Sequence, residues 1–166
     1  MQFKARPYQQ IIIDHILGNP RCAVWAGMGM GKTVSTLQAL DVLVSYIGLG
    51  PALVIAPLRV AQSTWPDEVT KWADLKHLRV SVILGTPKQR LAAVQTEADI
   101  YTTNYENLPW LVEHWGGNWP YKIVVADEAT RLKGFRTRQG STRAKALAKV
   151  NKHCAERFIE RTGTPA

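Results

Sequence analysis

The sequence predicts an open α/β fold in which helices cover both faces of a mostly parallel sheet. Short apolar runs of about five residues alternate with longer stretches of helical pattern. The runs are apolar at consecutive positions, which is typical of strands buried on both faces. Alternation of strand and helix favours an open sheet whose ligands bind at the carboxyl ends of the strands. With 166 residues and 46% hydrophobic residues, the chain is expected to form one domain.

Six runs are the expected strands, and six stretches between or before them are the expected helices. The strands are expected at residues 22–26, 52–56, 80–84, 98–102, 122–126 and 156–160. The helices are expected at residues 6–17, 31–47, 60–73, 87–95, 105–114 and 141–150. Gly48, Gly50 and Pro51 end the second helix, because glycine and proline interrupt the helical pattern. Pro66 and Pro87 lie where first helical turns begin.

Hydropathy and cysteine content exclude several classes of protein. No apolar run approaches the roughly 18 residues that a membrane span needs, and the first ten residues lack the apolar core of a signal peptide. The two cysteines, Cys22 and Cys154, lie far apart and do not form a C-x-x-C motif. A zinc site or a disulfide framework is therefore excluded as an organising feature. We expect a cytoplasmic protein without a membrane partner.

The net charge of +8 is concentrated in one segment. Residues 129–155 contain no acidic residue and eight basic ones, whereas the rest of the chain carries 13 of each sign. Such a segment often faces a polyanion, because Lys and Arg near phosphates release condensed counterions. The alternative is a solvated helix face, and composition alone does not separate the two.

A glycine-rich segment directly after the first expected strand has the pattern of a phosphate-binding loop. Residues 26–33 read AGMGMGKT, with Ala26 in place of the usual first glycine. Glycines let backbone N–H groups approach phosphate oxygens, and the following helix adds the positive end of its dipole. Lys32 is expected to reach the β- and γ-phosphates, and Thr33 to ligate Mg²⁺. The residues expected to bind the nucleoside triphosphate here are Gly27, Met28, Gly29, Met30, Gly31, Lys32 and Thr33.

Two adjacent carboxylates follow the expected strand KIVVA at residues 122–126. A parallel strand delivers the residues at its carboxyl end to the ligand edge of the sheet. We expect Asp127 to hold Mg²⁺ through water and Glu128 to orient and deprotonate the attacking water. The pattern favours hydrolysis of the γ-phosphate of a nucleoside triphosphate, with Lys32, Asp127 and Glu128 as catalytic residues.

These motifs and several others, in order along the whole chain, resemble the Swi/Snf-like DNA translocases of helicase superfamily two. The matching segments are ARPYQ at 5–9 (Q motif), AGMGMGKT at 26–33 (motif I), VIAPLRVAQSTW and EVTKW within 54–72 (motif Ia), YTTNYENL at 101–108, DEATRLKG at 127–134 (motif II) and RTGTPA at 161–166 (motif III). The resemblance implies a RecA-like P-loop NTPase lobe that spans motifs Q to III in residues 1–166.

The resemblance also implies roles for individual residues. Gln9 would read the adenine edge of ATP. The residues that would couple the nucleotide site to other parts are Thr130, Thr162 and Thr164. The residues that would contact DNA are Thr103, Asn104, Arg136, Arg138 and Arg143. Thr130 stands in motif II where His or Asp is usual, so we expect altered coupling at this position.

In this family a second RecA-like lobe carries motifs IV to VI, including arginines that complete the transition state. The sequence ends at Ala166, directly after motif III, and no arginine in it is assigned that role. We therefore expect a second lobe, in cis or in trans. Because an arginine finger is worth about 10³–10⁵ in rate, the isolated chain should bind Mg·ATP but hydrolyse it slowly.

The leading interpretation is a lobe of an ATPase that translocates on or remodels duplex DNA. Three alternatives stay open: a superfamily-two helicase acting on RNA or single-stranded DNA, a self-contained P-loop NTPase, and a non-catalytic module whose DNA binding is switched by ATP. Turnover without nucleic acid and preference between duplex and single strands separate them.

Overall fold

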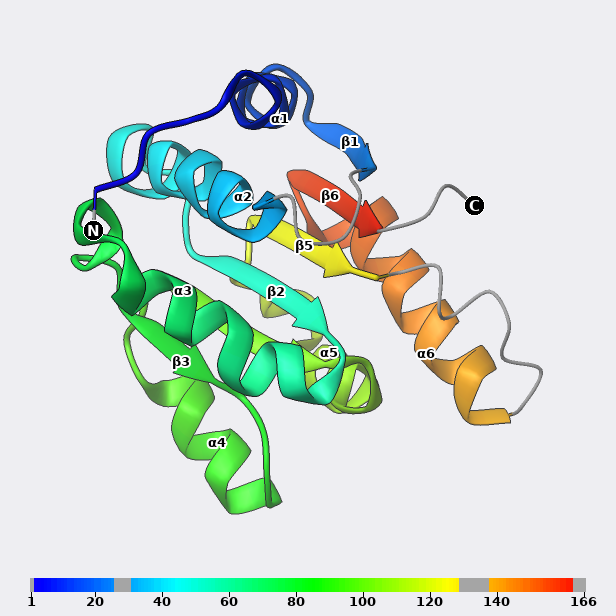
Figure 1. Ribbon diagram of the computed structural model, residues 1–166. Helices are drawn as coiled ribbons and strands as arrows, with labels where there is room; N and C mark the ends of the chain where they lie inside the picture. The colour runs from blue at the N-terminus through cyan, green and yellow to red at the C-terminus, as the bar shows by residue number, and fades with distance from the viewer. Residues whose placement is uncertain (1, 26–30, 129–137, 163–166) are drawn as a thin grey trace.

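The structure is a computed structural model that describes residues 2–25, 31–128 and 138–162. Within these residues six strands form one sheet in which every paired neighbour runs parallel (Figure 1). The strands are β1 (Arg21–Trp25), β2 (Ala52–Ala56), β3 (Val80–Val82), β4 (Ile100–Asn104), β5 (Ile123–Asp127) and β6 (Arg157–Thr162). Their order across the sheet is β1-β6-β5-β2-β4-β3, so β5 and β6 are neighbours near its centre.

The α-helices of the described chain occupy the segments between the strands and one segment before β1. They are α1 (Pro7–Gly18), α2 (Lys32–Asp41), α3 (Trp65–Lys71), α4 (Pro87–Gln95), α5 (Leu108–Trp115) and α6 (Arg138–Lys149). Wider π-helical turns continue α2 over Val42–Tyr46 and α6 over Val150–Cys154, and another precedes α3 over Val60–Thr64. These turns account for the longer helical patterns in the sequence.

Two apolar clusters lie on opposite faces of the sheet. Ile16 of α1, Leu37 of α2 and Ile159 of β6 belong to the first cluster, which also includes residues of α3. Leu111 of α5 and Phe158 of β6 belong to the second, together with residues of α4 and α6. Consecutive residues of β6 therefore point to different clusters, as the alternation of side chains along a strand requires. Helices cover both faces of the sheet, which confirms the predicted α/β class.

The strand expected at residues 98–102 instead spans Ile100–Asn104. Asp99 belongs to the preceding turn, where its carboxylate accepts a hydrogen bond from the Arg79 main-chain N–H at 2.8 Å. The polar end of the strand is nevertheless buried, because Thr102 donates to the Ala61 carbonyl and Thr103 to the Ile83 carbonyl. These two hydroxyl bonds satisfy side chains that would otherwise favour a loop.

Among the described residues, none of the helices has the length and apolar character needed to span a bilayer.

Candidate functional site

Residues from three parts of the sequence meet at the carboxyl edge of the sheet. Lys32 and Thr33 begin α2, Asp127 is the last residue of β5, and Arg161 lies near the end of β6. The register of the parallel strands places Asp127 directly beside Arg161. The carboxyl ends of parallel strands share one edge, which is why the expected partners Thr33 and Asp127 are brought together.

A buried arginine joins these two expected partners. The Arg161 Nη2 donates to Thr33 Oγ1 at 3.1 Å, and its Nη1 lies 3.3 Å from Asp127 Oδ2. Only 1% of the Arg161 side chain and 6% of the Asp127 side chain are exposed to solvent. The site is therefore organised around a guanidinium that has almost no access to water.

Trp65, the first residue of α3, completes this cluster. Its indole Nε1 donates to the same Asp127 Oδ2 at 3.2 Å, and the Arg161 guanidinium carbon lies 4.8 Å from the centroid of the Trp65 ring. A guanidinium over an indole face is attracted by the quadrupole of the ring. Trp65 thus contacts both charged partners at once, in a fully buried position.

Sequence reasoning missed both of these roles. Arg161 opens the RTGTPA segment, in which only the threonines were given roles, and Trp65 was noted only as part of the segment that resembles motif Ia. One signal was available: Arg161 is a charged residue at the carboxyl end of an expected apolar strand, where a parallel sheet binds ligands.

Burial and nearby charges shift the pKa of both cations in this cluster. Burial lowers the pKa of the Arg161 guanidinium, while the negative charges of Asp127 and Glu128 act in the opposite direction. Burial also lowers the pKa of Lys32, and the positive charge of Arg161 adds to that effect. Two basic and two acidic side chains therefore influence each other at one edge of the sheet.

Glu128 follows Asp127 in an unusual backbone conformation. Its φ is 56°, in the left-handed region that non-glycine residues rarely occupy. The Glu128 main-chain N–H donates to the Arg161 carbonyl at 2.7 Å, so pairing with β6 holds this turn. Strained residues of this kind cluster at functional sites, where the surrounding structure maintains them.

Gln9 of α1 connects the N-terminal segment to the start of α2. Its side-chain oxygen accepts from the Arg6 main-chain N–H at 2.9 Å, and its Nε2 donates to the Gly31 carbonyl at 3.4 Å. Gly31 has a φ of 66°, and a Cβ at this position would overlap the Gln9 amide. Glycine is therefore required here both for the backbone conformation and for the close approach of Gln9.

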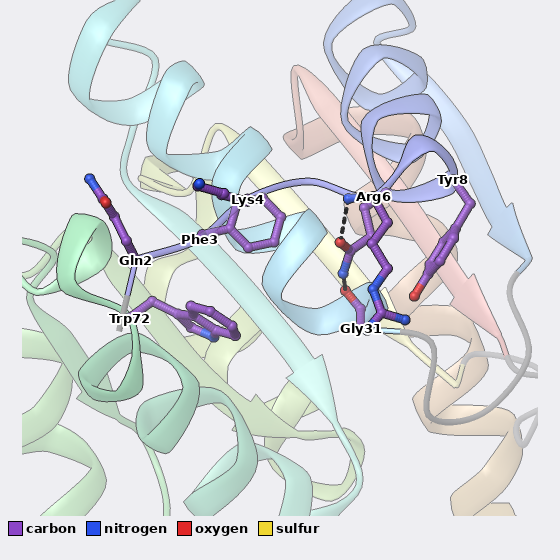
Figure 2. A pocket seen from close by; sticks show the side chains of 8 residues that line it. Gln2, Phe3, Lys4, Arg6, Tyr8, Gly31 and Trp72 are labelled. Atoms are coloured by element: carbon purple, nitrogen blue, oxygen red, sulfur yellow. Dashed lines mark hydrogen bonds between the residues drawn. The ribbon is translucent and has the colours of Figure 1, made fainter.

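A pocket of about 370 Å³ lies beside this contact (Figure 2). Figure 2 shows Arg6 and Tyr8 on the same side as Gly31, with Phe3 of the N-terminal segment and Trp72, which follows α3, on the other side. The lining residues are Gln2, Phe3, Lys4, Arg6, Tyr8, Gln9, Gly31 and Trp72. Its size is in the range of small-molecule sites, and it combines aromatic rings with amide and basic groups.

The expected DNA-contact residues of β4 are mainly internal. Thr103 is fully buried and donates to the Ile83 carbonyl at 2.9 Å, while Asn104 Oδ1 accepts from the Asn107 main-chain N–H at 3.1 Å. The next residue, Tyr105, is buried and its hydroxyl donates to the Asp127 carbonyl at 2.7 Å. This turn therefore lies at the same sheet edge as Asp127. Contact of Thr103 and Asn104 with DNA stays a prediction.

The basic segment is described only in part. Arg143 of α6 is largely buried, and its Nη2 lies 3.6 Å from Glu106 Oε1 in the turn that follows β4. Arg138 and Thr162 are placed in α6 and β6, but their side chains are not described. The expected site residues that lie outside the described residues are Gly27, Met28, Gly29, Met30, Thr130, Arg136 and Thr164.

Comparison with known proteins identifies the family. The family described as SNF2-related domain matches residues 21–166. The chain belongs to the SNF2-related domain family. The matching fold is found in the Sulfolobus solfataricus SWI2/SNF2 ATPase core solved in complex with dsDNA, with a TM-score of 0.78 and 28% identity over 99% of this chain and 33% of that chain. The family and the RecA-like fold are as the sequence predicts.

Two curated relatives of the chain are much longer than it. The chain is 52% identical to putative protein p41 of Acyrthosiphon pisum secondary endosymbiont phage 1, over 99% of this chain and 36% of that protein. It is 28% identical to the human DNA annealing helicase and endonuclease ZRANB3, over 100% of this chain and 15% of that protein. The chain thus spans 36% of the phage relative and a smaller share of the human one.

Proposed function

We propose that this SNF2-related chain binds ATP and Mg²⁺ at the carboxyl edge of its sheet and is one lobe of a DNA-dependent ATPase. The observation that carries the proposal is the meeting of Thr33 and Asp127 through Arg161, at 3.1 Å and 3.3 Å. These are the residues that a P-loop NTPase uses for its metal.

The donor set fits Mg²⁺. Thr33 offers a hydroxyl oxygen and Asp127 a carboxylate, and Mg²⁺ prefers such oxygen ligands. The guanidinium of Arg161 already contacts both oxygens, which indicates that the position between them favours positive charge. Bound Mg²⁺ would offset the charge of the β- and γ-phosphates of ATP.

The protein's own residues supply the other roles. Lys32, at the start of α2, would bind the β- and γ-phosphates next to the positive end of the helix dipole. Glu128 would orient a water molecule and accept its proton, and the turn with φ of 56° fixes its backbone next to Asp127. The pocket beside Gln9 and Gly31 would hold the adenosine part of ATP.

The DNA-dependent part of the proposal is supported by the family. The Sulfolobus relative was solved with dsDNA, and the human relative is described as a DNA annealing helicase. We propose that residues 1–166 form the first lobe, which works with a second RecA-like lobe in cis or in trans to translocate on or remodel duplex DNA. Competition between duplex DNA and single-stranded DNA or RNA for binding to the chain separates this proposal from the alternatives.

Calorimetric titration of the purified chain with ATP and Mg²⁺ tests the nucleotide site. Lys32→Ala should weaken ATP binding by about 10- to 100-fold, since a charge-assisted hydrogen bond contributes about 1.5–3 kcal/mol. Lys88→Ala, in the exposed first turn of α4, is the matched control and should bind as the unmodified chain does. Unchanged ATP binding by Lys32→Ala would contradict the proposed site.

Turnover of ATP with and without duplex DNA tests the lobe assignment. ATP binding with negligible turnover in both conditions is expected of a lobe that lacks its partner. Fast turnover without DNA would mean that the chain completes its own active site and acts as a self-contained NTPase.

A further inference from the structure

The Arg161 side chain lies between the two residues assigned to the metal. Its two terminal nitrogens divide their contacts, with Nη2 on Thr33 Oγ1 and Nη1 beside Asp127 Oδ2. No part of the proposed catalytic machinery explains why a buried cation should be placed there. The feature also differs from a surface ion pair, because Arg161 is only 1% exposed.

The hydrogen bonding of this arginine is incomplete. Among the described residues, Nε and Nη1 of Arg161 have no aligned hydrogen-bond acceptor, although Nη1 is close to Asp127. The aligned bond to Asp127 Oδ2 comes instead from Trp65 Nε1. A buried guanidinium with unmet donors is costly, so it persists because the carboxylate and the Trp65 ring attract it.

Adding a second cation to this arrangement creates a conflict. Thr33 Oγ1 has lone pairs to accept from Arg161 or to bind Mg²⁺, but two positive charges at one oxygen repel each other strongly in a water-poor site.

We propose that Arg161 is a positioning residue that competes with Mg²⁺ for Thr33 and Asp127. In the structure the guanidinium contacts both the threonine hydroxyl and the carboxylate. When Mg·ATP binds, Thr33 exchanges its contact with Arg161 for the metal. The inference rests on the proposed function, because it requires ATP and Mg²⁺ as the ligands.

This competition makes a specific statement about metal affinity. Binding of Mg·ATP must break the 3.1 Å contact between Arg161 and Thr33, and this cost raises the Mg²⁺ concentration that is needed. Removing the guanidinium removes the cost. A residue that cooperated with Mg²⁺ in binding phosphate would have the opposite effect, because its loss would raise the Mg²⁺ requirement.

The experiment measures ATP binding by calorimetry over a series of MgCl₂ concentrations. For Arg161→Leu, the concentration of Mg²⁺ that gives half-maximal binding should fall about tenfold, as expected when one charge-assisted hydrogen bond no longer has to be broken. Arg161→Lys keeps the charge but lacks the planar fork that bridges two partners, so the fall should be smaller. Arg161→Lys also serves if Arg161→Leu does not fold.

Arg157→Gln is the matched control. Arg157 lies four residues earlier on β6, hence on the same face of the strand, and its Nη1 donates to the Ile16 carbonyl at 3.1 Å. Losing this half-buried contact perturbs β6 without removing any contact of Thr33 or Asp127. The Mg²⁺ requirement of Arg157→Gln should equal that of the unmodified chain.

The outcomes separate this inference from the proposed function. Suppose the unmodified chain binds ATP, Lys32→Ala weakens that binding, and both Arg161 variants need as much Mg²⁺ as before or more. Competition by Arg161 is then wrong and the nucleotide site stands. If the unmodified chain does not bind ATP at any MgCl₂ concentration, the proposed function is wrong and this inference falls with it.

Discussion

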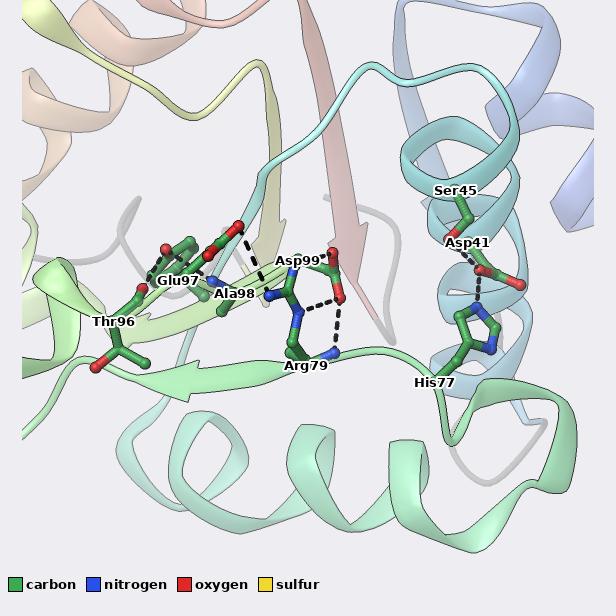
Figure 3. A network of polar contacts seen from close by, with 9 residues as sticks. Asp41, Ser45, His77, Arg79, Thr96, Glu97, Ala98 and Asp99 are labelled. Atoms are coloured by element: carbon green, nitrogen blue, oxygen red, sulfur yellow. Dashed lines mark hydrogen bonds and ion pairs between the residues drawn. The ribbon is translucent and has the colours of Figure 1, made fainter.

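Two arginine–aspartate pairs lie at opposite ends of the parallel strands and have the same separation. At the carboxyl ends, Arg161 and Asp127 join β6 to β5 at 3.3 Å, and both side chains are almost fully buried. At the amino ends, Arg79 and Asp99 join the starts of β3 and β4, also at 3.3 Å (Figure 3). In that pair 56% of the Arg79 side chain and 23% of the Asp99 side chain are exposed.

The difference shows that the environment, rather than the distance, decides what an ion pair does. Water around Arg79 screens the Arg79–Asp99 pair, so this pair contributes little to stability and mainly links β3 to β4. The Arg161–Asp127 pair is shielded from water, so removing one partner leaves the other as an uncompensated buried charge. A buried pair of this kind is weak evidence for stability and stronger evidence for a ligand site.

The Arg79–Asp99 pair belongs to a hydrogen-bond network that connects the starts of neighbouring strands. Asp99 accepts from the Arg79 main-chain N–H as well as from its side chain, and the Asp99 carbonyl accepts from the Ala52 N–H at 3.0 Å. Figure 3 shows a second contact nearby, in which His77 and Ser45 both point at the Asp41 carboxylate. These bonds fasten strand starts and helix ends to each other.

The largest expected effect comes from removing the carboxylate of the buried pair. Asp127→Ala should lower the free energy of unfolding by about 3–5 kcal/mol, because the Arg161 guanidinium stays buried without its partner. Urea denaturation followed by circular dichroism measures this loss. A loss below about 1 kcal/mol would mean that water reaches Arg161 and that the pair behaves like an exposed one.

A double variant sharpens this result. Asp127→Ala combined with Arg161→Leu removes both charges, and buried ion pairs replaced by apolar residues are often neutral in stability. The double variant should therefore recover at least half of the stability lost in Asp127→Ala. A double-mutant cycle gives the interaction free energy between the two side chains. Simple addition of the two single losses would contradict an interaction between the two side chains.

Substitution of Trp65, which contacts both Asp127 and Arg161, should give the next largest loss of stability. Trp65→Phe keeps an aromatic ring beside Arg161 but removes the donor to Asp127 Oδ2, at a cost of about 1–3 kcal/mol for a buried acceptor left without its bond. Trp72→Phe is the control, because the Trp72 Nε1 donates to Glu68 in a half-buried place. Equal losses in the two variants, measured by urea denaturation, would remove the special role of Trp65.

The smallest effect is expected at the amino ends. Partial burial alone would raise the pKa of Asp99, but the hydrogen bonds and charge of Arg79 outweigh it and lower that pKa below the ordinary 3.8. Its stabilising contribution is therefore present at neutral pH and is lost as the pH falls below 3.8. Asp99→Asn should remove this acid-dependent part, and added salt should shrink the difference at neutral pH. Thermal unfolding across pH measures both.

Much of the fold could be predicted because buried parallel strands have a distinctive pattern. KIVVA and ALVIA are apolar at consecutive positions, and the observed β5 and β2 lie within one residue of them. The strand at Ile100–Asn104 was misplaced by two residues because Thr103 and Asn104, at its carboxyl end, are polar. The Thr103 hydroxyl is buried with the Ile83 carbonyl as its acceptor, and Ile83 is distant in sequence.

The candidate site likewise contains residues that local sequence patterns predict and residues that they do not. Lys32, Thr33, Asp127 and Glu128 follow from local patterns, since each lies directly after a strand or at a helix start. Arg161 does not, because its role depends on the register that sets it beside Asp127. Trp65 reaches the Arg161–Asp127 pair because of how α3 packs on the sheet. The spacing of tryptophans in the sequence does not reveal this packing.

The hydrogen bond from the Tyr105 hydroxyl to the Asp127 carbonyl links two regions that the sequence treats as separate motifs. Tyr105 begins the turn after β4, and Asp127 ends β5 at the proposed nucleotide site. Linkage between two binding equilibria is reciprocal. If DNA bound at this turn strengthens or weakens nucleotide binding through Tyr105, bound nucleotide must change the affinity for DNA by the same factor. A single hydrogen bond of this kind would then couple the two binding sites in both directions.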